Sequence, residues 1–100
     1  MATPTLKVSN PVREVIRHLY PRLKREIRAA LVDILADSTC GKPLERELEG
    51  YWSLRVKRHR IIYRPDSEGA EIVAIGPRRI IYEEVTRQLL YSRGTQNKST

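Results

Sequence analysis

Apolar and polar side chains alternate over residues 51–57, which is the pattern of a β-strand with one face in the core. The residues expected on the core face are Trp52, Leu54 and Val56, and those on the other face are Ser53, Arg55 and Lys57. A second strand over 60–64 sends Ile61 and Tyr63 one way and Arg60, Ile62 and Arg64 the other. The pattern therefore predicts two short strands joined by a basic turn, with one apolar face and one cationic face.

Apolar residues recur at helical spacing before this hairpin and predict two consecutive helices. Asn10 followed by Pro11 is typical of a helix start, with Asn10 as the N-cap. The first apolar stripe comprises Val12, Val15, Ile16 and Leu19. Pro21 disfavours helical geometry at Tyr20, so the second helix begins with Pro21 in its first turn and continues to about Asp37. The second apolar stripe comprises Leu23, Ile27, Ala30, Leu31, Ile34 and Leu35. Both stripes are expected to face inward, so that the two helices form a helical hairpin.

The remaining segments complete an α+β pattern. We expect strands over residues 6–8 and 71–75, a loop over 38–43, a helical turn over 44–48, a turn over 65–69 and a last helix over 80–91. This order predicts a small antiparallel β-sheet with an N-terminal helical hairpin packed on one face and a C-terminal helix. We expect Trp52 and Tyr63 to belong to the core.

The length of 100 residues suits one compact domain with one modest core. We expect this domain over residues 1–92 and a polar, frayed tail over 93–100. No apolar run approaches the roughly 20 residues of a membrane span, and no signal peptide precedes the domain, so we expect a cytoplasmic protein without a membrane partner. Cys40 is the only cysteine, which excludes an intrachain disulfide.

The charge of the chain indicates a polyanionic partner. The formal net charge is +7 and the isoelectric point is near 10. Residues 51–64 contain five Lys or Arg and no acid, whereas 65–77 contain three acids and no Lys or Arg. This clustering favours a nucleic acid or an acidic protein as the partner, although a basic run is also typical of a sheet edge that is kept from aggregating by charge.

Three segments in order carry a resemblance to a known family. They are the run from Leu44 to Val56 with Gly50 before Tyr51-Trp52, the run His59-Arg60-Ile61-Ile62-Tyr63, and the run Ile75-Gly76-Pro77-Arg78-Arg79-Ile80-Ile81-Tyr82. The chain resembles the RelE/ParE superfamily of bacterial toxin–antitoxin toxins, with YoeB-like features at Trp52-Ser53 and His59-Arg60. The resemblance implies a RelE-like fold and a ribosome-dependent mRNA endonuclease that a cognate antitoxin silences.

Four positions match functional positions of that family. The resemblance implies catalytic roles for Arg55, Arg60, Arg78 and Tyr82. The chain departs from the RelE branch at Ser53, where that branch has a lysine, and from the YoeB branch at Lys42, where that branch has a glutamate.

RNA cleavage by the 2′-hydroxyl needs neither a metal nor a cofactor, and we expect none. Converging arginines suit the stabilisation of charge on the phosphoryl oxygens. Arginine is a poor proton donor, so Lys57 or His59 is expected to protonate the leaving oxygen. Tyr82 either stacks on a base or acts as the general base. The residues expected to contact the nucleic acid are Lys57, Arg58, His59, Arg64 and Arg79.

Other interpretations remain open at this point. If Arg55 and Arg60 pair with Glu47, Glu49 or Glu71 across the sheet, their role is structural and not catalytic. A toxin resembling the ParE branch would block DNA gyrase without cutting RNA, and Ser53 favours that alternative. The third interpretation is a degenerate toxin that retains only the binding of its antitoxin.

Overall fold

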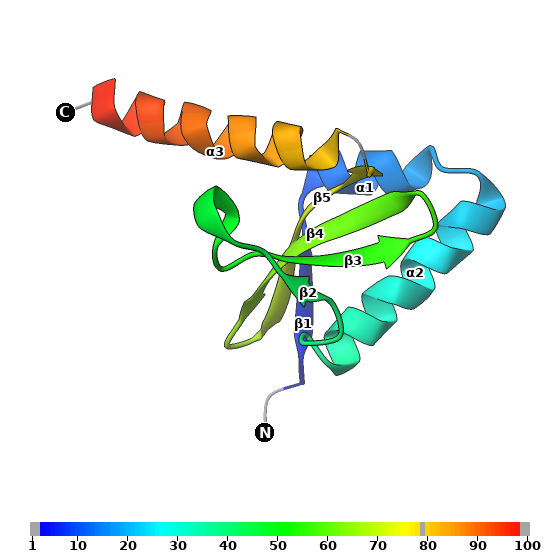
Figure 1. Ribbon diagram of the computed structural model, residues 1–100. Helices are drawn as coiled ribbons and strands as arrows, with labels where there is room; N and C mark the ends of the chain where they lie inside the picture. The colour runs from blue at the N-terminus through cyan, green and yellow to red at the C-terminus, as the bar shows by residue number, and fades with distance from the viewer. Residues whose placement is uncertain (1–2, 79, 99–100) are drawn as a thin grey trace.

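The computed structural model describes residues 3–78 and 80–98, the last eight of these by their backbone alone. The elements are β1 (Thr5–Val8), α1 (Asn10–Arg17), α2 (Pro21–Ala36), β2 (Lys42–Pro43), the 3₁₀ turn η1 (Arg46–Leu48), β3 (Trp52–Val56), β4 (His59–Asp66), β5 (Gly69–Pro77) and α3 (Ile81–Lys98). Figure 1 shows the strands in one twisted sheet, with α2 along one side and α3 projecting past the sheet.

The strands form one sheet in the order β1-β5-β4-β3-β2. Every neighbouring pair is antiparallel except β1 and β5, which run parallel; the long connection that a parallel pair needs is provided by the elements between them. The predicted α+β class, with a helical hairpin on one face and a C-terminal helix, is confirmed, but the sheet is mixed and not wholly antiparallel as predicted. The expected first strand does lie at an edge of the sheet.

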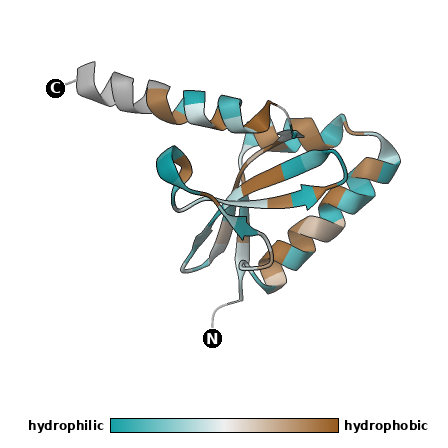
Figure 2. Ribbon diagram, viewed as in Figure 1, coloured by the Kyte–Doolittle hydropathy of each residue, from teal (hydrophilic) through white to brown (hydrophobic). Residues whose placement is uncertain are grey.

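One face of the sheet packs against α1 and α2 and forms the larger core. Its buried residues are Val12, Ile27, Ala30, Leu31, Ile34, Ile61, Tyr63, Ala70, Ile72 and Ile75. The side chains of Trp52, Leu54 and Val56 pack against this cluster, as the alternation in β3 predicts. Figure 2 shows the corresponding division of α2 into hydrophobic and hydrophilic sides.

Tyr63 ties this core to the loop after α2. Its side chain is fully buried, and its ring lies 6.4 Å from that of Trp52, so both residues belong to the core as predicted. The Tyr63 hydroxyl donates to the carbonyl oxygen of Ser38 at 2.7 Å and accepts from the amide of Gly41 at 3.1 Å. A Cβ at position 41 would lie 2.6 Å from that hydroxyl, so only glycine fits there. Burial raises the pKa of Tyr63 to about 12.

The opposite face of the sheet carries a smaller core under α3 and η1. Its buried residues are Leu48, Ile62, Ala74, Ile81 and Val85. Ile62 thus faces away from its neighbours in β4, as the alternation predicts. Two sheet faces of unequal apolar content therefore share the same three central strands.

Several local expectations differ from the structure. Ser9, not Asn10, is the N-cap of α1, and Asn10 is the first helical residue. Val15 is 40% exposed and lies outside the buried stripe of α1. The short strand β2 falls within the predicted loop, because two residues are too few for a period of two to be recognised.

The longer strands and the last helix also extend beyond their predicted bounds. β4 and β5 extend into the predicted turn over 65–69, which the structure narrows to Ser67 and Glu68. α3 continues to Lys98, beyond the apolar stripe that ends near residue 91. The division into a domain over 1–92 and a tail over 93–100 stays a prediction. Within the described residues, no helix has the length and apolar character needed to cross a membrane.

Candidate active site

Arg55 and Arg60 are directly opposite each other on the β3–β4 hairpin. Residues paired in this way share one face of an antiparallel sheet, here the face that also carries α3. The hairpin closes through a two-residue turn at Lys57 and Arg58, in which Lys57 has a positive φ of 55°. The predicted cationic face of the hairpin therefore exists and places two arginines side by side.

Ser53, Arg60 and Tyr82 form a hydrogen-bonded cluster between the sheet and the first turn of α3. The Ser53 hydroxyl shares a hydrogen bond of 2.9 Å with the Tyr82 hydroxyl, and the Nη1 of Arg60 donates to the same serine oxygen at 3.2 Å. Ser53 is only 2% exposed and is the one polar residue of the buried set within the described chain. This serine joins two of the predicted catalytic residues.

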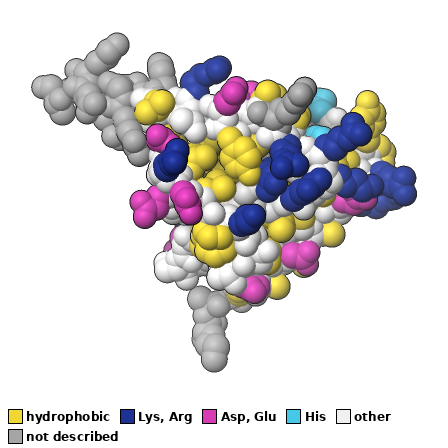
Figure 3. Space-filling view, viewed as in Figure 1, with side chains coloured by type: hydrophobic (Ala, Val, Ile, Leu, Met, Phe, Trp, Pro, Cys, Tyr) yellow, Lys and Arg dark blue, Asp and Glu magenta, His cyan; other side chains and the backbone are white. Residues whose placement is uncertain are grey.

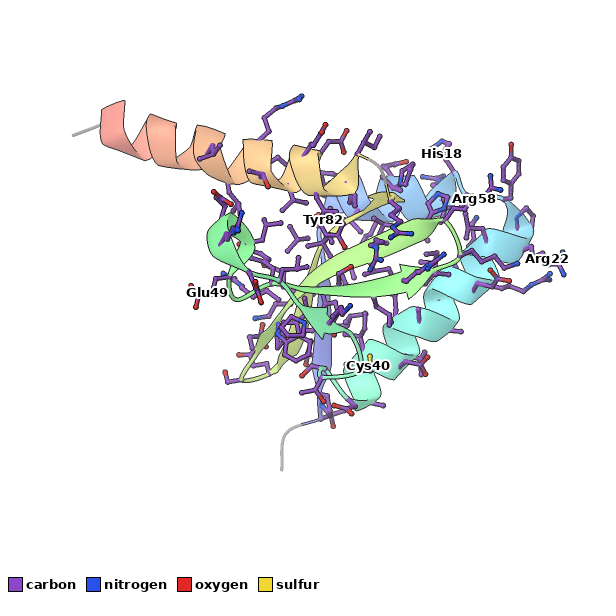
Figure 4. The ribbon with its side chains drawn as sticks, in the orientation of Figure 1. His18, Arg22, Cys40, Glu49, Arg58 and Tyr82 are labelled. Carbon is purple, nitrogen blue, oxygen red and sulfur yellow. The ribbon has the colours of Figure 1, made fainter. Side chains whose placement is uncertain are left out.

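Close approach of α3 to the sheet makes this cluster possible. Gly76 pairs with Arg60 in the β4–β5 register. A Cβ at Gly76 would come within 3.0 Å of Cδ1 of Ile81, so the missing side chain leaves room for the start of α3. Tyr82 follows directly and points toward the sheet (Figure 4). The late glycine of the sequence motif thus positions the tyrosine.

Within the described part of the chain, the guanidinium of Arg60 has no carboxylate partner. Its Cζ atom lies 5.8 Å from the centre of the Tyr82 ring, within the range of a cation–π contact. Its Nε is buried and has no hydrogen-bond partner among the described residues. A buried donor without a partner costs free energy, which an acceptor such as a phosphate oxygen would recover after a small rearrangement.

Arg78 lies beside the turn of the hairpin. Its amide donates to the carbonyl oxygen of Arg58 at 2.9 Å, and its side chain is exposed. This bond brings the segment after β5 next to the same end of the hairpin that carries Arg55 and Arg60. Arg79, which the sequence also assigned to nucleic-acid contacts, lies outside the described residues.

The two predicted proton donors lie on the α2 side of the hairpin. The Nζ of Lys57 is 3.0 Å from a carboxylate oxygen of Glu26 in α2. His59 has the same parity in β4 as Ile61 and Tyr63, and it lines a groove on that side together with Tyr20 and Leu23. The structure does not bring Lys57 or His59 together with Arg60 and Tyr82.

Arg64 is at the far end of β4 and pairs with Glu71 at 3.3 Å. Glu71 was one of the carboxylates considered as a partner for Arg55 or Arg60. Neither of those two arginines has an ion pair to a carboxylate within the described part of the chain. The Nε of Arg55 donates instead to the carbonyl oxygen of Lys57 at 3.0 Å.

Positive charge gathers around this end of the sheet. Figure 3 shows Lys and Arg side chains concentrated where the hairpin approaches α2, with acidic side chains more scattered. The cluster of Ser53, Arg60 and Tyr82, together with the exposed Arg55 and Arg78, can bind a phosphate and neutralise charge on it. Sequence reasoning did not find the joining role of Ser53, because alternation along β3 gave only its face and not its contact with α3.

The comparison with protein families assigns the chain to a class of protein, the toxins of type II toxin–antitoxin systems. Residues 5–82 match the family model described as "ParE toxin of type II toxin-antitoxin system, parDE", so the chain belongs to this family. The predicted membership of the RelE/ParE superfamily is thereby confirmed.

Solved structures of the superfamily share the fold. A chain of the toxin–antitoxin complex RelBE2 from Mycobacterium tuberculosis is 28% identical, with a TM-score of 0.67, and the match covers 77% of this chain and 100% of that one. A chain of the YoeB–YefM complex from Staphylococcus aureus is 20% identical, with a TM-score of 0.62, and the match covers 74% and 95%. A chain of the intact RelBE complex of E. coli is 14% identical, with a TM-score of 0.64, and the match again covers 74% and 95%. Among curated protein sequences, none matches the chain.

Proposed function

We propose that this toxin inhibits translation by cleaving mRNA on the ribosome, without a metal ion. The observation that carries the proposal is the pairing of Arg55 with Arg60 across β3 and β4. Like charges directly opposite each other destabilise a sheet, and neither arginine has an ion-paired carboxylate among the described residues. A phosphate between the two guanidinium groups would remove this repulsion.

The residues have distinct roles in the proposed reaction. The 2′-hydroxyl loses its proton as its oxygen attacks the adjacent phosphorus, the bond to the 5′-oxygen breaks, and that oxygen takes a proton from water, so the products end in a cyclic phosphate and a 5′-hydroxyl. Arg60 and Arg55 stabilise the charge on the phosphoryl oxygens, and Arg78 reaches the same phosphate or the next one from the end of β5. Tyr82, whose hydroxyl shares a hydrogen bond with Ser53, either accepts the proton of the 2′-hydroxyl in its deprotonated form or stacks on a base.

The chain supplies few groups that could protonate the leaving 5′-oxygen, and this is our reason for expecting that cleavage depends on the ribosome. Lys57 is paired with Glu26 and His59 lies on the α2 side of the hairpin, so neither is set to protonate the leaving oxygen. A small protein with charge stabilisation but few proton donors depends on its substrate being aligned by other means. The decoding centre of the ribosome holds mRNA in a fixed geometry, and the cytoplasm is where this toxin would meet it.

A cognate antitoxin is the other partner that we propose. The solved relatives from M. tuberculosis, S. aureus and E. coli were each determined as toxin–antitoxin complexes. A partner with acidic and apolar residues would cover the cationic end of the sheet and neutralise it. Binding of that kind blocks access to Arg55, Arg60 and Arg78 whichever target the toxin has.

A second candidate function is the inhibition of DNA gyrase without RNA cleavage. The specific observation in its favour is Ser53, which is buried and engages both Arg60 and Tyr82 where RelE-like toxins carry a lysine. A site with one fewer cation and its tyrosine tied to a serine is less suited to catalysis. The match to the ParE family model agrees with this alternative.

The test is to map the ends of a reporter mRNA by primer extension after incubation with the purified protein, with and without translating ribosomes. New ends that need ribosomes support the proposal, and they should disappear with Arg60→Ala. Arg28→Gln is the matched control, because it removes an exposed charge from α2. Intact mRNA together with inhibited DNA supercoiling by gyrase would replace the proposal with the second candidate.

A further inference from the structure

A groove separates the start of α2 from the turn of the β3–β4 hairpin. It has a volume of about 370 Å³. From α2 it is lined by Tyr20, Arg22, Leu23 and Glu26, and from the hairpin by Lys57, Arg58 and His59. The groove is distinct from the cluster of Ser53, Arg60 and Tyr82, which lies on the other face of the sheet.

Tyr20 is the unusual residue of this groove, because its side chain is 82% exposed. It precedes Pro21 at the junction of α1 and α2, where the chain turns between the two helices. An exposed aromatic ring beside cationic groups is the arrangement on which single-stranded nucleic acids stack their bases. The imidazole of His59 and the aliphatic part of Leu23 supply further flat and apolar surface nearby.

The charged side chains around the groove favour a polyanion, and its mostly apolar lining suits the base of a nucleotide. Its only carboxylate, that of Glu26, is paired with Lys57 at 3.0 Å. Arg22 and Arg58 are exposed and take part in no ion pair within the described residues. Figure 4 shows both arginines at the same end of the molecule. The first turn of α2 contains no acidic residue and has no side-chain cap, which adds positive potential there.

We propose that this groove binds a nucleotide of single-stranded RNA that flanks the cleaved bond, with its base on Tyr20 and its phosphates on Arg22 and Arg58. The inference rests on the proposed function for the identity of the RNA. The backbone of Arg58 accepts a hydrogen bond from Arg78, so the groove and the cationic cluster meet at the hairpin turn. A strand that leaves the phosphate held by Arg55 and Arg60 passes over this turn into the groove.

The experiment measures RNA binding directly and does not depend on cleavage. The full chain is titrated into a short fluorescent single-stranded RNA with 2′-O-methyl riboses, which cannot be cut, and anisotropy is followed at several salt concentrations. Tyr20→Ala should weaken binding roughly 5- to 100-fold, as loss of one stacked base does. Tyr20→Phe keeps the ring and should bind like the wild type, whereas Tyr20→Leu should be as weak as Tyr20→Ala.

Charge variants test the phosphate contacts. Arg22→Gln and Arg58→Gln should each lower the slope of log K against log salt by about 0.7, the value for one contact to a single strand. Arg28→Gln removes the same charge from α2 outside the groove and should leave the slope unchanged. Equal effects of all three substitutions would mean diffuse attraction to the surface and would overturn the inference. Thermal unfolding of each variant shows that the fold is retained.

The remaining outcomes separate this inference from the proposed function. If Tyr20→Ala binds the RNA as tightly as the wild type, the groove is not an RNA-binding site, even if mRNA is cut on the ribosome. If Tyr20→Leu binds as tightly as the wild type, the surface needs only an apolar side chain, as a protein partner would, and base stacking is excluded. If binding depends on Tyr20 but no mRNA is cut on the ribosome, the RNA-binding role of the groove stands and the endonuclease proposal fails. Arg60→Ala should abolish cleavage while leaving the effect of Tyr20→Ala on oligonucleotide binding in place.

Discussion

The two faces of the central sheet are built from the same three strands and differ in what they cover. The core between the sheet and α1 and α2 contains ten buried residues in one apolar cluster. The core between the sheet, η1 and α3 contains a cluster of five, and Ser53, Arg60 and Tyr82 lie on the same face of the sheet, linked by hydrogen bonds. Successive residues of β3 and β4 contribute alternately to the two faces.

The difference between the two faces of the sheet shows how a domain of this size can accommodate a polar site. Burial against α1 and α2 supplies most of the apolar stabilisation, so the other face can keep charged groups that have no carboxylate partner among the described residues. Arg60 has a buried Nε without a hydrogen-bond partner among the described residues, and it lies opposite Arg55. Such an arrangement reduces stability locally and is expected where a ligand binds. Four substitutions test this division.

The largest effect on stability should come from Ile61→Ala, on the α1/α2 face. Ile61 is fully buried in the large cluster, so truncation removes its apolar burial and leaves a cavity. We expect the free energy of unfolding to fall by about 2–5 kcal/mol in a urea titration. Ile61→Val should lose only about 0.5–1.5 kcal/mol. A loss below that of the valine variant would show that this face is not the main source of stability.

Arg60→Ala, on the α3 face, should show the opposite behaviour, with a large loss of cleavage and a small change in stability. If the arginine stabilises charge in the reaction, ribosome-dependent cleavage should fall by roughly 100- to 1,000-fold. The stability should stay within about 1 kcal/mol of the wild type, because the substitution also relieves the repulsion with Arg55. Growth inhibition and urea unfolding measured on the same variant check both halves, and Arg28→Gln serves as the control for charge. Full toxicity of Arg60→Ala would contradict the catalytic model.

Tyr63→Phe should lower the free energy of unfolding by about 1–3 kcal/mol, because the carbonyl of Ser38 and the amide of Gly41 lose their partner in a partly buried position. Burial raises the pKa of Tyr63 to about 12 in the folded chain. An unfolded tyrosine ionises near pH 10, so the unfolded state releases its proton first and stability falls as the pH rises from about 10 to about 12. The wild type should lose more stability over this window than Tyr63→Phe in parallel urea titrations. Identical slopes would show that Tyr63 does not titrate as proposed.

The smallest effect overall should come from Ser53→Ala, which is expected to change stability only modestly. This substitution removes the hydroxyl oxygen that Tyr82 and Arg60 both contact. Both partners are only partly buried, so water replaces much of the lost bonding and stability should fall by about 0.5–1.5 kcal/mol. A double-mutant cycle with Tyr82→Phe isolates the bond between the two hydroxyls. A coupling energy near zero would mean that Ser53 does not hold Tyr82.

The sequence contained enough to predict the hairpin and the helices. Alternation over 51–57 assigned Trp52, Leu54 and Ser53 to their faces because the side-chain period of a strand is two. Pro21 and the helical spacing after it predicted α2 as a long helix. Local pattern was less reliable at Ser9, where the N-cap lies one residue earlier than expected, and at β2, which is too short to have a period.

The periodicity of apolar residues and the order of the predicted elements determined the α+β class, and the clustering of Lys and Arg determined a cationic hairpin. Membership of the RelE/ParE superfamily rested on the resemblance of three segments to that family. Only the tertiary structure decided that Ser53 meets Tyr82 of α3, that Lys57 turns to Glu26 of α2, and that His59 lies in the groove beside Tyr20. Each of these contacts joins segments distant in sequence, and their positions depend on how the helices pack on the sheet, which no local pattern specifies.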